Sequence, residues 1–375
     1  MEKTTITRFL LQLIAVLPLL AAAQNNTISW NKVLTGMIGN TPATMYLQKT
    51  GKEYHGYYYY DRVQIPIKLG DAGLPGNGDS VHIAAWDQEI SESLDGRITE
   101  PIFAGTWATT IGEQTTSSLP FSFTENKTVP APYFDMVYTT YETEFPGGLE
   151  KGSNPGYDYF AATLWPMATT PVSFANFFKQ WVNVQFGNKN SSLPIGKFFI
   201  NEKNRGLASW KKEISGVKKE AFKDLPSSYS RSTERRLLVM YQNEKYLSIA
   251  DYSYEFSGGA HGNGGSTMHT LDIKNNKELK LADILMPATK HKVEQLLDAA
   301  VRVRFHIAKT AKLSSDEGGE LLVKKVELTE NFYLTGKGIG FNYTPYEIAA
   351  YAYGEVNLFI PYSKLKGLLR PGLGE

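Results

Sequence analysis

The sequence contains no cysteine among its 375 residues. Disulfide bridges, thiolate metal sites and cysteine nucleophiles are therefore excluded, and each domain must be stabilised by its own hydrophobic core. An excess of charge of one sign is also missing, since 39 basic residues face 38 acidic ones and the formal net charge is +1. This balance argues against nucleic-acid binding, which needs a basic surface.

Long apolar runs are missing after the N-terminus, so no membrane span is expected once the N-terminal segment is removed. That segment has Lys3 and Arg8, then an apolar run over residues 9–20, and then three alanines at residues 21–23. A basic start, a short apolar stretch and small residues, in this order, are typical of a secretory signal peptide. We therefore predict that residues 1–23 are a cleaved signal peptide and that the mature protein is periplasmic or secreted.

Recognisable catalytic motifs are missing as well. The sequence has no G-x-S-x-G nucleophile elbow, no H-E-x-x-H zinc motif and no phosphate-binding P-loop. Among the six histidines, only His261 and His269 lie close together, with Asp272 nearby. A metal-dependent or acid–base hydrolase centred on His261 stays an alternative. Because no ligand set with diagnostic spacing occurs, no metal or cofactor is expected.

Aromatic residues are abundant, at 13% of the sequence, and 22 of them are tyrosines. Residues 24–119 are predicted to form an all-β module rich in glycine and aromatic residues. Along its tyrosine run, Tyr58 faces one side of a strand, whereas Tyr57 and Tyr59 face the other. Residues 111–119 are rich in serine and threonine and are predicted to be a linker.

The remainder is predicted to contain two α+β segments, residues 120–235 and 236–375. The first has a helix over residues 174–186, whose aromatic residues recur at helical spacing. The second has strands, then an amphipathic helix over residues 289–305, then strands again. This order favours antiparallel sheets with helices packed on one face, so the predicted fold class is α+β with an N-terminal all-β module.

Residues 257–265 form a glycine cluster with the sequence Ser-Gly-Gly-Ala-His-Gly-Asn-Gly-Gly. Glycine at so many positions permits positive φ angles and the close approach of another chain segment. The stretch is either a recognition loop or a wide bend between two strands, and both interpretations stay open.

Two separated motifs resemble one known family. The first is YSYEFSGGAHG at residues 252–262, followed by TLDI at 270–273 and LKLADIL at 279–285. The second is GFNYTPYEIAAYAYG at residues 340–354. Both are similar to motifs of the extracytoplasmic domain found in lysozyme-sensing anti-sigma factors and beside some peptidoglycan deacetylases. The resemblance covers about residues 120–375 and leaves the N-terminal module outside.

In that family the domain is a binding or sensing module, and the best-understood members bind lysozyme. The resemblance therefore implies an exported, non-enzymatic binding or sensing protein of the cell envelope. Its partner would be a lysozyme-like hydrolase or the peptidoglycan glycan, and a purely structural envelope protein is the other alternative. Tyrosine suits recognition because it adds contact area at a low entropic cost. The residues expected to contact the partner are Ser257, Gly258, Gly259, His261, Gly262, Tyr346, Tyr351 and Tyr353.

Overall fold

The structure, a computed structural model, describes residues 29–71, 80–86, 91–112, 114–128, 132–145, 154–190 and 192–373. The predicted signal peptide, residues 1–23, lies outside the described residues. Within these ranges, no helix is both long and apolar enough to cross a membrane.

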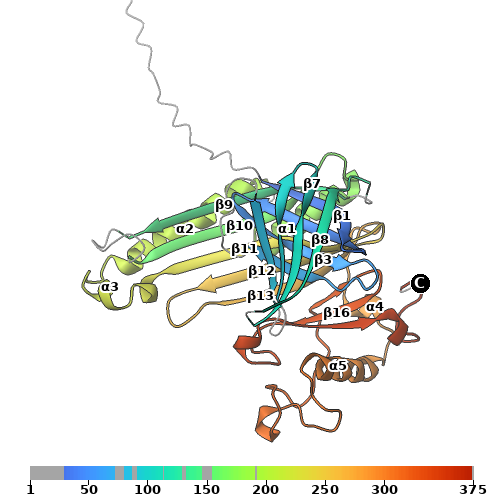
Figure 1. Ribbon diagram of the computed structural model, residues 1–375. Helices are drawn as coiled ribbons and strands as arrows, with labels where there is room; N and C mark the ends of the chain where they lie inside the picture. The colour runs from blue at the N-terminus through green and yellow to red at the C-terminus, as the bar shows by residue number, and fades with distance from the viewer. Residues whose placement is uncertain are drawn as a thin grey trace, which may run out of the picture.

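Eight antiparallel strands form a closed barrel in the N-terminal part (Figure 1). They are β1 (Trp30–Ile38), β2 (Thr41–Thr50), β3 (Glu53–Tyr60), β4 (Ile67–Asp71), β5 (Ser80–Trp86), β6 (Ser91–Thr99), β7 (Ile102–Ile111) and β8 (Gln114–Glu125). The pairing of β1 with β8 closes the barrel. Aliphatic and aromatic side chains such as Leu34, Phe103 and Phe123 fill its interior. The all-β character predicted for the N-terminal module is confirmed.

The prediction of a linker over residues 111–119 is wrong. Most of this segment belongs to β8, which pairs with β7 on one side and with β1 on the other. Its side chains are exposed over residues 114–120, so polar residues fit there, and β-branched threonine favours a strand. β8 also runs across residue 119, where the end of the N-terminal module was predicted.

A mixed six-stranded sheet follows the barrel, in the order β14-β13-β12-β11-β10-β9. Its strands are β9 (Phe134–Glu144), β10 (Gly156–Pro166), β11 (Arg231–Gln242), β12 (Tyr246–Phe256), β13 (Asn263–Asp272) and β14 (Lys277–Glu278). β10 and β11 run parallel, although antiparallel sheets were predicted. A parallel pair needs a long crossover. Here the crossover contains α1 (Val172–Gln185), α2 (Ile195–Ile214) and the short α3 (Ala221–Asp224).

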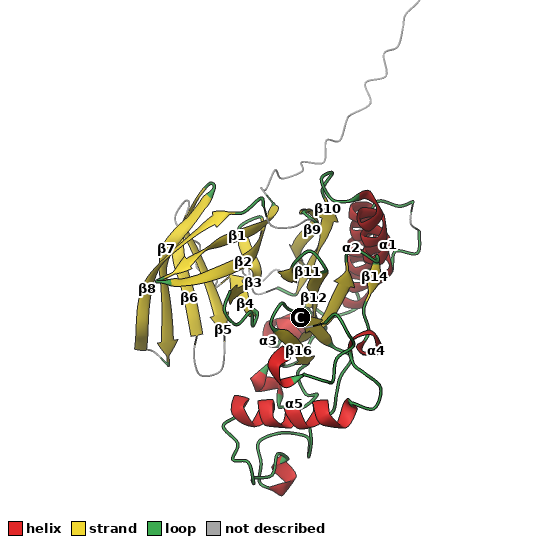
Figure 2. Ribbon diagram, turned by 90° about the vertical axis from the view of Figure 1, so that its right-hand side faces the viewer, coloured by secondary structure: helices red, strands yellow, loops and turns green. Residues whose placement is uncertain are grey.

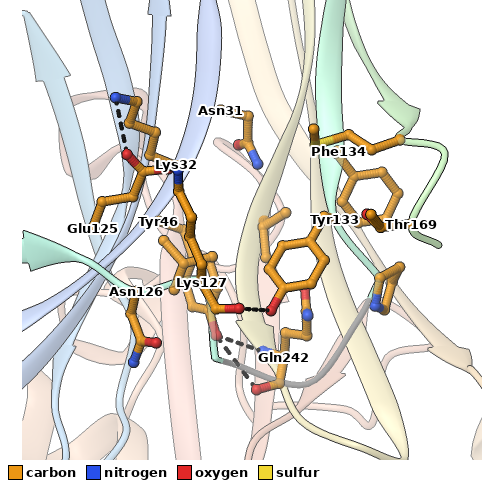
Figure 3. Close-up of a pocket in the computed structure, with 14 residues that line it drawn as sticks. Asn31, Lys32, Tyr46, Glu125, Asn126, Lys127, Tyr133, Phe134, Thr169 and Gln242 are labelled. Carbon is orange, nitrogen blue, oxygen red and sulfur yellow. Dashed lines mark hydrogen bonds and ion pairs between the residues drawn. The ribbon is translucent and has the colours of Figure 1, made fainter. Parts of the chain in front are cut away.

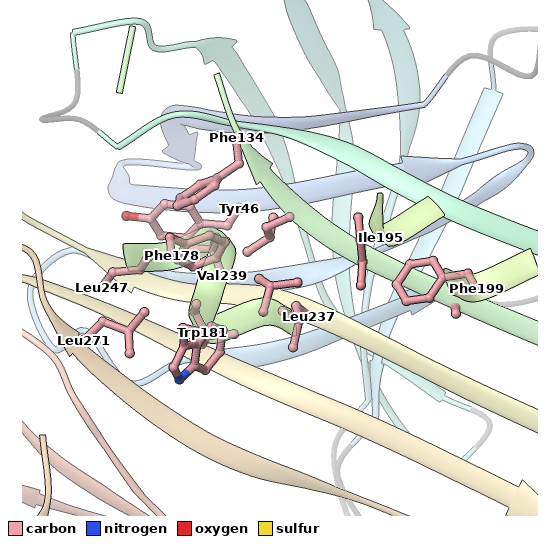
Figure 4. Packing of buried hydrophobic residues seen from close by; sticks show 14 of the residues in the cluster. Tyr46, Phe134, Phe178, Trp181, Ile195, Phe199, Leu237, Val239, Leu247 and Leu271 are labelled. Carbon is pink, nitrogen blue, oxygen red and sulfur yellow. The ribbon is translucent and has the colours of Figure 1, made fainter. Parts of the chain in front are cut away.

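Helices α1 and α2 cover one face of the six-stranded sheet (Figure 2). Phe178 and Trp181 of α1 share a buried cluster with Leu237 and Val239 of β11 (Figure 4). Burying one such side chain stabilises the fold by about 1.5–3 kcal/mol, so this cluster holds the helices against the sheet. The predicted helix over residues 174–186 is confirmed by α1.

The barrel covers the opposite face, so barrel, sheet and helices form successive layers (Figure 2). Tyr58 belongs to the barrel core, whereas Tyr57 and Tyr59 point outward and join the clusters shared with the six-stranded sheet. The predicted alternation along the tyrosine run is confirmed. All three rings are buried because the barrel wall packs directly on a second sheet.

The C-terminal part adds a second, smaller sheet. The elements of this part are α4 (Leu281–Ile284), α5 (Lys290–Arg304), β15 (Phe332–Leu334), β16 (Gly338–Tyr343) and β17 (Val356–Pro361). α5 packs against β17 through Val293, Leu297 and Val301, which confirms the predicted helix over residues 289–305. β12 and β13 join the six-stranded sheet, whereas β15 to β17 form a sheet of their own. The predicted α+β fold class is confirmed.

Candidate functional site

The glycine loop, residues 257–262, connects β12 to β13. Gly258 and Gly259 have φ angles of 88° and 102°, a backbone region that glycine alone adopts without strain. A Cβ atom on Gly258 would lie 2.4 Å from the carbonyl oxygen of Ser228. Ser257 and Gly259 are exposed at the tip of the bend. The glycines therefore allow the turn and the close approach of another chain segment, as expected for a wide bend between two strands.

The tyrosine loop, residues 344–353, follows β16 and lies against the start of β13. Just before it, Nδ2 of Asn342 donates to the carbonyl oxygen of Ser266 at 3.0 Å. A Cβ atom on Gly265 would lie 2.9 Å from Cγ2 of Thr344, so the chain passes directly beside this glycine. The loop thus bends around the outer edge of β13 towards the glycine loop.

The structure brings the two loops together at Tyr351. Its hydroxyl group donates to the carbonyl oxygen of the buried Gly262 at 2.9 Å, across 89 residues of sequence. The His261 ring stacks on the Tyr351 ring, with 4.1 Å between centroids and 23° between planes. Nδ1 of His261 donates to the same Gly262 oxygen at 2.9 Å. One carbonyl with two lone pairs therefore fixes both rings.

Tyr346 extends this stack into solvent. Its ring centroid lies 5.6 Å from that of Tyr351, and the residue is 54% exposed. Its φ angle is 71°, which is rare for a bulky residue and costs about 1–3 kcal/mol. Such a conformation persists only where the surrounding structure imposes it. We call His261, Tyr346 and Tyr351 the aromatic step.

Tyr353 does not belong to the aromatic step. Its ring lies edge-on to Phe305, with 5.1 Å between centroids, and it packs on the C-terminal core. Its contacts are those of a core residue that anchors the tyrosine loop.

A polar hollow of about 420 Å³ lies beside the aromatic step. Its floor is formed by β11, β12 and the start of β13, and its wall by Thr344 and Pro345, which directly precede Tyr346. Because side chains alternate along strands, one set of polar groups faces the same side of the sheet. These groups belong to Thr233, Arg235, Ser253, Glu255, Asn263 and Thr267. These residues could not be predicted from the sequence, since only strand pairing brings them together.

Arg235 is the most firmly held side chain of the polar hollow. Its Nε and Nη2 atoms donate to the two carboxylate oxygens of Asp251 at 2.9 and 2.5 Å. Its guanidinium carbon lies 4.4 Å from the centre of the Phe186 ring. A bidentate ion pair and a ring contact together fix the plane of the guanidinium group.

The outer edge of β13 is covered by side chains from the C-terminal part. The backbone N–H of Met268 donates to Oδ1 of Asn331 at 2.6 Å, and Nδ2 of Asn331 donates to the carbonyl oxygen of Ser266 at 3.0 Å. The N–H of Ser266 donates to Oε1 of Glu355 at 2.6 Å. These side chains take the place of a neighbouring strand, and they fix the two loops relative to each other.

The alternative site built from His261, His269 and Asp272 does not form. His261 precedes the first residue of β13 whereas His269 lies near its end, so roughly 20 Å of strand separates them. Nδ1 of His269 pairs instead with Oε1 of Glu278 at 2.7 Å, and its ring lies 5.0 Å from that of Trp181. In the ranges that the structure describes, no cluster of three or more potential metal ligands occurs.

Two family models match the C-terminal part of the chain. The model described as Deacetylase PdaC matches residues 184–264, and the model described as Protein of unknown function (DUF3298) matches residues 282–363. The glycine loop lies in the first match and the tyrosine loop in the second. The aromatic step therefore forms where the two domains meet, and the barrel lies outside both matches.

One solved structure shows a similar fold over about two thirds of the chain. A member of the DUF3298 family from Bacteroides fragilis is 22% identical, covers 65% of this chain and 96% of its own, and superposes with a TM-score of 0.55. A DUF3298 family protein from Pseudomonas aeruginosa is 20% identical, with coverages of 64% and 95% and a TM-score of 0.43. No curated protein matches the chain.

These matches confirm the resemblance found in the motifs at residues 252–262 and 340–354. The C-terminal part of the chain contains a PdaC domain, residues 184–264, followed by a DUF3298 domain, residues 282–363.

Proposed function

We propose that this protein is an exported binding protein of the cell envelope and that its partner docks on the aromatic step and the polar hollow. The PdaC domain, which is typical of envelope proteins, supports this location. The signal-peptide pattern of residues 1–23 supports export.

The observation that carries the proposal is the preformed stack of His261 on Tyr351, fixed by the carbonyl group of Gly262. Rings that are already held in place lose little further freedom when a partner binds, which favours affinity. Tyr346, exposed and held in a strained backbone conformation, presents a third ring. Exposed tyrosines of this kind are common anchors in recognition surfaces.

The chemistry of the hollow favours a wall glycan as the ligand. A sugar chain offers many hydroxyl groups together with apolar ring faces. The hollow provides hydroxyl, amide, guanidinium and carboxylate groups that can pair with hydroxyls. The neighbouring aromatic step provides flat apolar surfaces. A small number of precisely placed polar groups beside aromatic rings is typical of small-ligand sites.

A lysozyme-like hydrolase is the second candidate partner, because the motifs at residues 252–262 and 340–354 resemble those of lysozyme-sensing anti-sigma factors. A stable protein partner would cover about 800 Å² on this chain, which is more than the hollow itself. It would therefore also contact exposed residues of the glycine loop, such as Ser257 and Gly259.

Co-sedimentation with purified peptidoglycan and a pull-down with immobilised lysozyme test both candidates. Retention by peptidoglycan is expected, and His261→Ala or Tyr346→Ala should weaken it at least about fivefold, as for a recognition hot spot. Val303→Ala is the matched control, because Val303 is 77% exposed on α5 and outside the proposed face. Retention by neither partner, in a protein that unfolds cooperatively, contradicts the proposal. Retention by lysozyme alone would identify the hydrolase as the partner that docks on the aromatic step and the polar hollow.

A further inference from the structure

A second cavity, of about 310 Å³, lies between the barrel and the six-stranded sheet (Figure 3). Its walls come from β1, β2 and β8 on the barrel side and from β9, β11 and the turn near Thr169 on the other side. It shares no lining residue with the polar hollow, so it is independent of the proposed docking face. Most of the lining is apolar and includes Val33, Phe134, Met167 and Val239.

The tyrosine hydroxyl groups at this cavity are already paired within the protein. The backbone N–H of Gln242 donates to the Tyr46 hydroxyl oxygen at 3.1 Å. The Tyr133 hydroxyl donates to the carbonyl oxygen of Lys127 at 2.6 Å (Figure 3). These bonds fix the two rings as rigid walls and leave neither hydroxyl group as the main polar contact for a ligand.

Asn31 also lines the cavity, and its side chain projects from β1 towards the space between Tyr46 and Tyr133 (Figure 3). Its Oδ1 atom is buried and has no surface open to a ligand. The cavity therefore offers a ligand mainly apolar contacts.

The charges around the cavity cancel. Nζ of Lys32 lies 2.8 Å from Glu100 and 3.2 Å from Glu125, and Nζ of Lys127 lies 3.7 Å from Glu125. Two cations thus face two carboxylates. A charged ligand would give up its hydration without finding a free counter-charge, which is costly in an apolar site.

We propose that this cavity binds an uncharged, largely apolar small molecule. Cavities at the boundary between two folding units are preferred ligand sites. Because its walls come from both the barrel and the sheet, a bound molecule joins the two, and it stabilises the folded chain as any ligand of the native state does.

The probe for the test is N-phenyl-naphthylamine, an uncharged aromatic amine with one N–H that fluoresces strongly in apolar surroundings. Titration into the full chain should give saturable enhancement at one site. Thr169→Trp, which places a bulky ring at the exposed rim of the cavity, should abolish it. Thr115→Trp, at an exposed position of β8, is the matched control and should leave binding unchanged. Absence of saturable binding to the unaltered chain overturns the proposal, and so does equal binding by the Thr169→Trp protein.

Thermal unfolding of each variant verifies that the barrel and sheet remain folded.

Discussion

Lys68 of the barrel strand β4 and Glu355 of the DUF3298 domain form an ion pair, with 3.0 Å between Nζ and Oε2, although 287 residues separate them. The same carboxylate accepts hydrogen bonds from the N–H of Ser266 at 2.6 Å and from Nδ2 of Asn342 at 2.9 Å. Nζ of Lys68 also lies 4.1 Å from the centre of the Tyr252 ring. One carboxylate thus joins the barrel, the six-stranded sheet and the smaller sheet.

Substitution of Glu355 should destabilise the protein more than substitution of Lys68. Burial raises the pKa of Glu355, but Lys68, Asn342 and Ser266 together lower it below its ordinary value. Glu355→Gln puts amide hydrogens where N–H groups now donate and should cost about 1–3 kcal/mol. Lys68→Met should cost at most about 1 kcal/mol, because the lysine side chain is 42% exposed. Urea unfolding measures both values, and equal losses would contradict the central role of the carboxylate.

Gly262→Ala should disturb the meeting point of the two loops. The added Cβ would lie 2.4 Å from the end of the Tyr254 ring and 2.7 Å from the carbonyl oxygen of Glu255. We expect a loss of about 1–3 kcal/mol, as for overpacking in a core, together with weaker partner binding. Gly216→Ala is the control, because no atom lies within 4 Å of its added Cβ. Unfolding curves that coincide for both variants would argue against close packing at Gly262.

Tyr351→Phe tests whether the bond between the loops matters for binding. The variant keeps the ring but loses the bond to the Gly262 carbonyl, so stability should fall by about 0.5–1.5 kcal/mol and peptidoglycan retention should fall as well. Tyr362→Phe is the matched variant, because the Tyr362 hydroxyl donates to the Thr335 carbonyl at 3.0 Å, outside the aromatic step and the polar hollow. It should lose similar stability without losing retention. Equal loss of retention in both variants would indicate a general effect of destabilisation.

Stability should depend on pH through Glu278. Burial raises its pKa, but hydrogen bonds from His269 and Trp181 and the charge of Lys280 outweigh burial and lower the pKa from 4.5 to about 2. The folded state therefore stays ionised where the unfolded chain takes up a proton. The resulting stabilisation, up to about 3 kcal/mol, is fully present above pH 4.5 and is lost as the pH falls towards 2.

The control for this pH dependence is Glu278→Gln, which cannot ionise. The difference in unfolding free energy between the unaltered chain and this variant should be constant near neutral pH and should shrink below pH 4.5. Guanidinium unfolding at a series of pH values measures it. A difference that does not change down to pH 3 would show that the pKa of Glu278 is not lowered.

The helices and the strand alternation could be predicted because they depend on neighbours in sequence. The aromatic residues between 174 and 186 recur at the helical period, and the sides taken by Tyr57, Tyr58 and Tyr59 follow from the two-residue repeat of a strand. The juxtaposition of His261 and Tyr351 could be proposed only from the family resemblance, since their separation in sequence carries no geometric information.

The polar hollow and the apolar cavity could not be predicted. Arg235, Ser253 and Thr267 meet only through the register of three strands. Asn31 and Phe134 meet only through the packing of the barrel on the sheet. The linker predicted at residues 111–119 is wrong for a different reason: residues 114–119 pair with residues 107–111 of β7, and the polar composition of the segment conceals this hairpin.

The sequence by itself determined the absence of disulfides, the near-neutral charge, the helices, the α+β class and the two family motifs, since composition and short periodicities express these features directly. Only the tertiary structure decided which strand closes the barrel, that β10 and β11 run parallel, and that His261 stacks on Tyr351. These features depend on contacts between distant segments, whose free energy arises only when the whole chain folds and buries its apolar surface.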